Sequence, residues 1–388
     1  MPVSSIAQNG TAVKLEMQNI GGSYEGKLNP QGSEMSGTWR QGGGALPLIL
    51  RRTDKLPTVS RPQEPKKPYP YIEEEVRYEN KQGGAKLAGT LTLPPGTGPF
   101  PTVLLITGSG QQDRDEALMG HRPFLVLADY LTRKGIAVLR VDDRGVGGST
   151  GEVMTATTED FAGDVLAGVE FLKSRGNPID VHKIGLIGHS EGGMIAPMVA
   201  LRSHDVAFIV MMAGTGVPGD QILMAQVEGL SKAAGVPPAT IAKNLDMERQ
   251  ALEIIKQESD TKVRETKLRE LSAQAAAAAS PWFRFFVMYD PAPALQKVTC
   301  PVLALNGELD LQVPPSLNLP AIEKALKAGG NRDYAIVKLP KLNHLFQTSQ
   351  TGSVTEYSQI EETIAPVALE TMSGWILRHT TTNTATRP

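Results

Sequence analysis

Short apolar runs alternate with helix-favouring segments over most of the chain, from about residue 71 onward. The runs that predict strands lie at 87–93, 102–107, 136–141, 183–187, 207–212, 302–306 and 334–339. The later runs are almost continuously apolar, which is typical of strands buried on both faces of a mostly parallel sheet. This alternation predicts an α/β fold in which helices flank a central sheet.

A long segment without a strand-like run interrupts the pattern after residue 212. Residues 221–234 and 239–279 are rich in Ala, Glu, Lys, Leu and Gln, which are good helix formers. We therefore expect a helical cap at 217–298, inserted above the sheet. This cap divides the α/β core into two parts, at 71–216 and 299–388.

Residues 1–55 follow a different pattern, in which short β-like runs such as 12–18 and 46–50 are separated by glycines. The Gly-rich turns lie at 21–22, at 32 and at 42–44. Three or four such strands are marginal as an independent domain, so we expect a small, partial β segment. Five prolines between residues 56 and 70 predict an extended linker.

Composition excludes several classes of protein. Lys and Arg total 39 against 41 Asp and Glu, a net charge of −2, which argues against a nucleic-acid-binding surface. No apolar run has the length of about 18–20 residues that spans a bilayer. The first residues lack a signal-peptide pattern, so the chain as it stands is expected to be cytoplasmic. The single cysteine, Cys300, rules out an intrachain disulfide and a Cys-based zinc site.

Two segments match the pattern Gly-x-Ser-x-Gly, centred on Ser149 and Ser190. The pattern makes a nucleophile when a sharp turn between a strand and a helix exposes the serine. Ser190 follows the strand-like run 183–187 and precedes a helix-like run, whereas Ser149 lies in a Gly-rich loop. Ser190 is therefore the predicted nucleophile, and Ser149 is interpreted as a turn residue.

A serine nucleophile needs a histidine base and a carboxylate that orients the base. His344 lies in the loop after the last predicted strand, where the chain order Ser, Asp, His places the base. Asp310 follows the preceding strand and is the predicted carboxylate. Glu308 and Asp220 remain as alternatives for the carboxylate, and His121 is a candidate for a further contact in the pocket.

The oxyanion of an acyl-transfer reaction needs two backbone N–H donors. Glu191, next to the nucleophile, would supply one, and the Gly-Ser-Gly loop after strand 102–107 would supply the other. In this loop Ser109 is the first choice and Gly110 the second. The aromatic segment 281–289 in the cap is either a substrate-binding wall or cap core, and its candidate pocket residues are Trp282, Phe285 and Phe286.

These motifs, taken together and in order, resemble the α/β-hydrolase fold, and within it bacterial serine esterases of the esterase D type. The resemblance covers about residues 85–380 and rests on TGSGQQDRDE (107–116), DDRGVGGSTG (142–151), GHSEGG (188–193), NGELDLQVPP (306–315) and LNHLFQ (342–347). It implies a triad of Ser190, Asp310 and His344, with the cap between the sixth and seventh strands of the core. Residues 23–52 resemble the end of a longer β-domain that precedes the hydrolase in some relatives, which are often exported.

The function expected from residues and resemblance is that of a serine carboxylesterase. It would hydrolyse short- to medium-chain esters of small molecules through an acyl-enzyme, without a metal or an organic cofactor. The same triad also suits an aminopeptidase, an amidase or a thioesterase. A non-catalytic binding protein is the alternative from another class, and the sequence allows a homodimer.

Overall fold

The computed structural model describes residues 3–17, 22–41, 44–53, 59–272 and 275–381. The chain divides into two compact units, Met1–Thr58 and Val59–Pro388. The expected turns at Gly21 and at 42–43, and the start of the linker at 56–58, lie outside the described residues.

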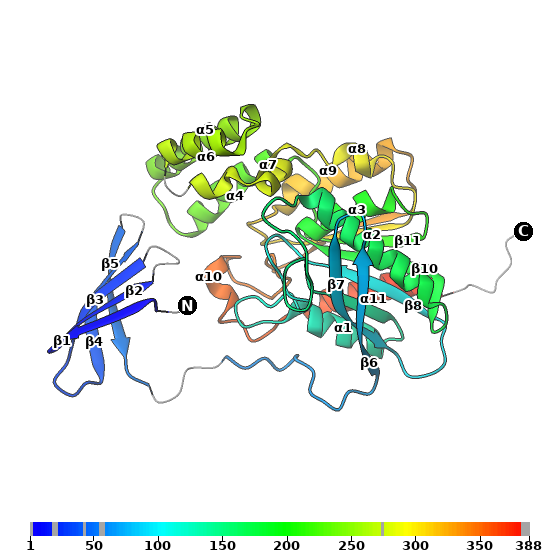
Figure 1. Cartoon of the computed structure of the whole chain (residues 1–388), viewed down its shortest axis with the longest axis horizontal. Helices are drawn as coiled ribbons and strands as arrows, with labels where there is room; N and C mark the ends of the chain where they lie inside the picture. Colours follow the sequence, from blue (N-terminus) through cyan, green and yellow to red (C-terminus); the bar gives the residue numbers. More distant parts are fainter. Residues whose placement is uncertain (1–2, 18–21, 42–43, 54–58, 273–274, 382–388) are drawn as a thin grey trace, which may run out of the picture. The chain divides into compact units, whose positions relative to one another are not determined.

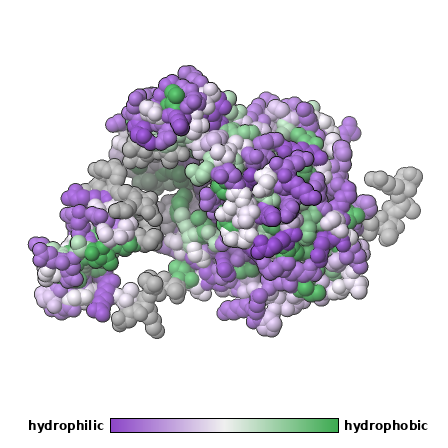
Figure 2. Space-filling view, viewed as in Figure 1, coloured by the Kyte–Doolittle hydropathy of each residue, from purple (hydrophilic) through white to green (hydrophobic). Residues whose placement is uncertain are grey.

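The smaller unit is an antiparallel sheet of five strands in sequential order, one or two more than expected. The strands are β1 (Ser5–Asn9), β2 (Ala12–Met17), β3 (Gly22–Leu28), β4 (Glu34–Gln41) and β5 (Gly44–Arg51). Tyr24 is buried at its centre and donates a hydrogen bond from its hydroxyl to the Met35 carbonyl at 2.8 Å. Hydrophobic residues gather on this unit (Figure 2), and Ile6 and Leu46 are among the exposed ones.

The larger unit is built on a sheet of eight strands in the order β13-β12-β11-β10-β8-β9-β7-β6 (Figure 1). β6 and β9 pair with β7 in antiparallel fashion, and every other pairing is parallel. The mostly parallel sheet is therefore confirmed. The strands are β6 (Ile72–Asn80), β7 (Ala85–Leu93), β8 (Phe100–Ile106), β9 (Ala137–Val141), β10 (Ile179–His189), β11 (Val206–Met212), β12 (Val302–Gly307) and β13 (Tyr334–Leu339).

Helices cover both faces of this sheet. α1 (Pro123–Arg133) and α11 (Pro366–Thr380) pack on one face, and α2 (Thr158–Arg175), α3 (Glu191–Ala200) and α9 (Pro315–Ala328) pack on the other. The sequence of β11 is apolar throughout because both faces of this strand are buried. Ile209 and Met211 join the core on the α2 side, while Phe208 and Val210 join the core on the α1 side.

The cap is a separate helical layer inserted between β11 and β12, the sixth and seventh strands of the sheet (Figure 1). Asp260 caps α6 by accepting hydrogen bonds from the amides of Lys262 and Val263, so the helical stretch expected at 239–279 is divided. Its elements are α4 (Gly219–Ala233), α5 (Pro238–Gln257), α6 (Thr261–Leu271), the 3₁₀ helix η2 (Ala275–Ala279), α7 (Pro281–Met288) and α8 (Ala292–Leu295). None of the helices in the described part of the chain is both long and apolar enough to cross a membrane.

The described part of the Pro-rich segment, 59–70, has no helix or strand, as expected, but side chains fasten it to the larger unit. Arg61 donates to the carbonyl of Gly120 at 2.9 Å and to that of Ser358 at 2.9 Å, just after the short helix α10 (Val354–Tyr357). Gln63 donates to the carbonyl of Ile364 at 2.7 Å. This stretch is therefore a fixed part of the larger unit.

Candidate active site

Ser190 lies in the turn between β10 and α3 with a positive φ of 54°. Its amide donates to the carbonyl of Met212 on the neighbouring strand at 2.8 Å, which ties the turn to the sheet. A Cβ atom at Gly188 would come within 2.0 Å of the Gly192 carbonyl, and one at Gly192 within 2.2 Å of the Ile106 carbonyl. Glycine is therefore required on both sides of a serine held in a strained conformation.

His344 and Asp310 form a buried pair in the loops after β13 and β12. The His344 Nδ1 atom lies 2.7 Å from Asp310 Oδ2. The other oxygen of Asp310 accepts the amides of Gln312 and Val313, each at 2.8 Å, so the carboxylate is fixed on both sides. With Nδ1 held in this way, Nε2 is the ring nitrogen left to exchange a proton.

Ser190 and His344 line the same pocket, which has a volume of about 290 Å³. Loops of the core supply one side of the pocket, including Ser109, Glu116, Thr215 and Val313. The cap supplies the other side through Ile222, Leu223 and Gln226 on α4 and through Trp282, Phe283 and Phe286 on α7. The pocket is therefore a largely apolar chamber that lies between core and cap, with the serine and the histidine on its core side.

The loop after β8 reaches this pocket with Ser109, but not with Gly110, which lines a separate internal cavity. The Gly108 amide is already used, because it donates to Glu116 Oε1 at 2.8 Å. Within the described chain, the Ser109 amide donates to no protein acceptor. The Glu191 amide is one of the first N–H groups of α3, which have no partner inside the helix. Ser109 and Glu191 thus have backbone amides without an acceptor in the described part of the chain.

Behind Ser190, His189 forms a buried pair with Glu116 that the sequence did not reveal. His189 Nδ1 lies 2.8 Å from Glu116 Oε1, and its Nε2 lies 3.1 Å from the carbonyl of His344. Both ring nitrogens thus face oxygen atoms, and an imidazolium beside an ionised Glu116 satisfies both contacts. Burial alone would lower the pKa of His189, but the neighbouring Glu116 raises it. The pair joins the loop of Gly108 to the loop of His344.

The carboxylate of Glu191 joins the turn that holds Ser190 to the cap. Glu191 Oε1 accepts hydrogen bonds from Trp282 Nε1 on α7 at 2.7 Å and from the Thr158 hydroxyl on α2 at 2.6 Å. Burial raises the pKa of this carboxyl, and hydrogen bonding to Thr158, Trp282 and Ser109 opposes the rise. Helix α7 is therefore tied directly to the residue that follows Ser190.

A family of known proteins matches the central part of this chain. Residues 122–348, more than half of the chain, match the family described as serine aminopeptidase, S33 (Hydrolase_4). The matched region includes Ser190, Asp310 and His344. The chain belongs to this family.

Two proteins named esterases are similar to this chain in sequence. Esterase EstD of Thermotoga maritima is 26% identical over 311 residues, which cover 79% of this chain and 69% of EstD. Esterase FrsA of Yersinia enterocolitica is 38% identical over 97 residues, 25% of this chain and 21% of FrsA.

Two solved structures share the fold of this S33 chain. An esterase from Pyrobaculum calidifontis has a TM-score of 0.52 at 17% identity, and the match covers 79% of this chain and 84% of that one. The α/β hydrolase GrgF from a Penicillium species has a TM-score of 0.50 at 17% identity, covering 79% of this chain and 99% of GrgF. The α/β-hydrolase fold expected from the motifs is therefore confirmed.

Two of the residues predicted to line the pocket, His121 and Phe285, do not line it. His121 does not line the pocket, because its ring is buried between Tyr357, whose carbonyl lies 2.8 Å from Nε2, and the Thr363 hydroxyl, 3.0 Å from Nδ1. Phe285 does not line the pocket either, and its ring packs against the core and stacks on Tyr289. Trp282 and Phe286 do line the pocket, and Phe283 takes the place expected for Phe285.

The competing residues for nucleophile and acid have structural contacts instead. The Ser149 hydroxyl is buried, donates to the Asp142 carbonyl at 2.7 Å and accepts from the Ala88 amide at 2.9 Å. Glu308 accepts from the Lys341 amide at 3.3 Å, and Asp220 pairs with Lys256 at 2.6 Å within the cap. Among the described residues, no group of three or more His, Cys, Asp or Glu side chains could hold a metal ion.

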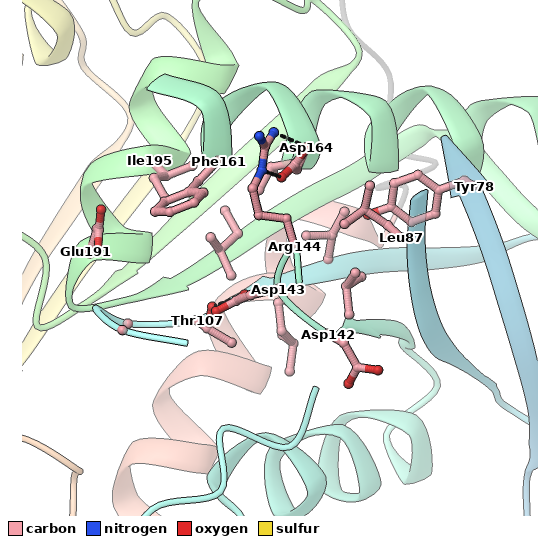
Figure 3. A pocket seen from close by; sticks show the side chains of 17 residues that line it. Tyr78, Leu87, Thr107, Asp142, Asp143, Arg144, Phe161, Asp164, Glu191 and Ile195 are labelled. Atoms are coloured by element: carbon pink, nitrogen blue, oxygen red, sulfur yellow. Dashed lines mark hydrogen bonds and ion pairs between the residues drawn. The ribbon is translucent and has the colours of Figure 1, made fainter. Parts of the chain in front are cut away.

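A small cavity of about 50 Å³ lies beside the loop that follows β8 (Figure 3). Asp143 points into it and accepts hydrogen bonds from the Thr107 hydroxyl at 2.7 Å and from the Gln112 amide at 2.9 Å. Burial raises the pKa of Asp143 to about 7, and the nearby carboxylates of Glu116 and Glu191 add to the rise. Asp143 therefore holds the loop after β8 in place, and its pKa lies near neutrality.

Because the pKa of Asp143 is raised, the free energy of unfolding should depend on pH, and Asp143→Asn should remove this part of the pH dependence. A carboxyl whose pKa is raised by folding binds more protons in the folded state, so its stabilising contribution is present below about pH 4 and is lost as pH rises through about 7. The slope is at most about 1.4 kcal/mol per pH unit. Urea unfolding at pH 5, 6, 7 and 8 should show the wild type losing stability relative to the variant as the pH rises, because the asparagine does not titrate. The variant should keep the contact with Thr107, since the Thr107 hydroxyl can reverse and accept a hydrogen bond from the asparagine amide. Parallel curves for the two proteins would contradict this.

Thr215, on the pocket wall, allows a second prediction about the stability of the protein. Its hydroxyl is buried and has no hydrogen-bond partner among the described residues. We expect Thr215→Val to raise the free energy of unfolding by about 1 kcal/mol, because an isosteric methyl group removes an unsatisfied polar atom. Thr363→Val is the matched control, since the Thr363 hydroxyl bonds to His121 and its loss should destabilise the protein. Equal effects of the two substitutions in chemical denaturation would contradict this account of Thr215.

Proposed function

We propose that this chain is a serine carboxylesterase that works through an acyl-enzyme, with Ser190 as nucleophile, His344 as base and Asp310 as orienting acid. The observation that carries the proposal is the buried pair of His344 and Asp310, joined at 2.7 Å, with His344 opening onto the same pocket as Ser190. The relatives named esterases in both the sequence and the structure comparisons support it.

Each group in the pocket has a defined task in this reaction. Ser190 Oγ attacks the ester carbonyl carbon as His344 Nε2 removes its proton, and the carbonyl oxygen becomes an oxyanion. The amides of Glu191 and Ser109 donate hydrogen bonds to that oxyanion. His344 then gives its proton to the leaving alcohol, and the C–O bond to this alcohol breaks. A water molecule deprotonated by His344 attacks the acyl-enzyme, which releases the acid and restores Ser190.

The pocket favours an uncharged ester over a peptide with a free amino terminus. Glu116 is the sole carboxylate among the described residues that line it, and it is already paired with His189. An aminopeptidase needs an unpaired carboxylate to bind the substrate ammonium group. The volume of about 290 Å³ and the aromatic cap wall suit short to medium acyl chains of small-molecule esters.

Hydrolysis of a p-nitrophenyl ester series from acetate to laurate, alongside amino-acid p-nitroanilides and an acyl thioester, tests this function. We expect ester turnover to dominate and to be absent from Ser190→Ala. Dominant anilide turnover would instead assign the aminopeptidase activity for which the family is named, and dominant thioester turnover a thioesterase. Esterase activity that survives in Ser190→Ala would overturn the proposed nucleophile.

A further inference from the structure

The cap contains a second cavity, of about 480 Å³, that the proposed reaction does not use. α4, α5, the end of α6, η2 and α7 line it, it is partly open to solvent, and most of the side chains that line it are apolar. Among them are Val227, Leu230, Ala251, Ile255 and Phe283. A cavity of this size lined by aliphatic side chains suits a hydrocarbon chain.

This cavity adjoins the catalytic pocket at a shared wall. Phe283 lines both spaces. On α4, Leu223 and Gln226 face the catalytic pocket, and Val227 and Leu230, one turn further along, face the cap cavity. A continuous stripe on one helix therefore leads from the catalytic pocket to the cap cavity, with the Phe283 ring at the boundary.

The cavity follows α5 from an apolar end near Phe283 to a more polar end. Arg284 donates to the Lys256 carbonyl at 3.2 Å, which places α7 beside the C-terminal end of α5, where Ile255 is fully buried. The lining residues Asn244 and Glu248 lie toward the other end of α5 and are half-buried. At 1.5 Å per residue, the helix between residues 244 and 255 is about 16 Å long. The space is thus elongated and is most apolar where it meets the catalytic pocket.

We propose that the cap cavity is a second subsite for the hydrocarbon chain of the ester, and that the Phe283 ring sets the chain length admitted from the catalytic pocket. This inference rests on the esterase function proposed above. A short chain ends within the catalytic pocket, in front of the Phe283 ring. A longer chain continues along α5 once the ring is turned aside or removed, and its additional methylene groups leave water for an apolar environment.

Phe283→Ala tests the boundary. The quantity to measure is the ratio of kcat/KM for p-nitrophenyl laurate to kcat/KM for p-nitrophenyl acetate, in the variant and in the wild type. Because burying two further methylene groups is worth about tenfold in binding, we expect the ratio to rise at least tenfold. A ratio within twofold of the wild-type value would overturn the proposal.

Larger side chains inside the cap cavity distinguish a true subsite from a general loosening of the cap by Phe283→Ala. Ala251→Phe and Leu230→Trp, each combined with Phe283→Ala, should return the ratio to within about threefold of the wild type. Two fillers guard against one failing to fold, which thermal unfolding would reveal. Glu253→Phe, at an exposed position of α5 outside the cavity, is the matched control and should leave the gain in place. A gain that survives both fillers would overturn the proposal.

The acetate measurement distinguishes a failure of this inference from a failure of the proposed function. If the wild type hydrolyses acetate and Ser190→Ala does not, the esterase function stands whatever the laurate ratio shows. If no ester is hydrolysed by the wild type, the proposed function fails and the subsite proposal fails with it.

Discussion

Replacing Ser190 with alanine should abolish ester turnover, lowering kcat by about a millionfold while the protein stays folded. The expected loss is this large because the variant has no nucleophile that could form the acyl-enzyme, so water would have to attack the ester carbonyl directly. Folding should survive because the turn is held by backbone contacts, including the 2.8 Å bond from the residue 190 amide to the Met212 carbonyl. Burst and steady-state release of p-nitrophenol, with circular dichroism of both proteins, measures the two effects.

Ser149→Ala is the matched control, because Ser149 occupies the other Gly-x-Ser-x-Gly segment. The Ser149 hydroxyl bridges the Asp142 carbonyl and the Ala88 amide, so its removal should cost about 1–3 kcal/mol of stability and leave most of the turnover. The opposite pattern, with turnover lost in Ser149→Ala and kept in Ser190→Ala, would refute the assignment of the nucleophile.

The arrangement of the candidate triad could be predicted because it depends on local motifs and on one property of parallel sheets. Their strands end at the same edge, so loops that follow β10, β12 and β13 come together although they are far apart in sequence. The apolar runs of the central strands were equally clear. β6 was missed because its sequence, IEEEVRYEN, alternates with charged residues, as an edge strand with one partner allows.

Other parts of the site depend on tertiary geometry that no local pattern contains. α7 has aromatic residues at 282, 283, 285 and 286, and only the rotation of the helix decides which of them face the pocket. Trp282 and Phe286, four residues apart, both line the pocket, whereas Phe285 packs against the core without lining the pocket. Glu116 is a polar loop residue in sequence, and its pairing with His189 joins positions 73 residues apart.

Asp310→Asn should lower kcat by about ten-thousandfold with little change in structure. Oδ1 of Asp310 accepts two backbone amides, so in the variant the amide oxygen should keep that position and the NH₂ group should replace Oδ2. A donor would then face His344 Nδ1, where the wild type has an acceptor 2.7 Å away. His344 would be forced to carry its proton on Nε2, the nitrogen that must receive the proton of Ser190, and so could not act as a base.

The pH dependence of kcat for p-nitrophenyl acetate in Asp310→Asn measures this effect, because hydroxide can bypass a base in the wrong tautomer and activity should rise toward high pH. Glu308→Gln is the matched control from the same loop. Glu308 contacts Lys338 and the Lys341 amide rather than His344, so this variant should keep kcat within about twofold of the wild type. If Glu308→Gln lost activity and Asp310→Asn kept it, the orienting acid would be Glu308, and the buried pair of His344 and Asp310 would have a structural role alone.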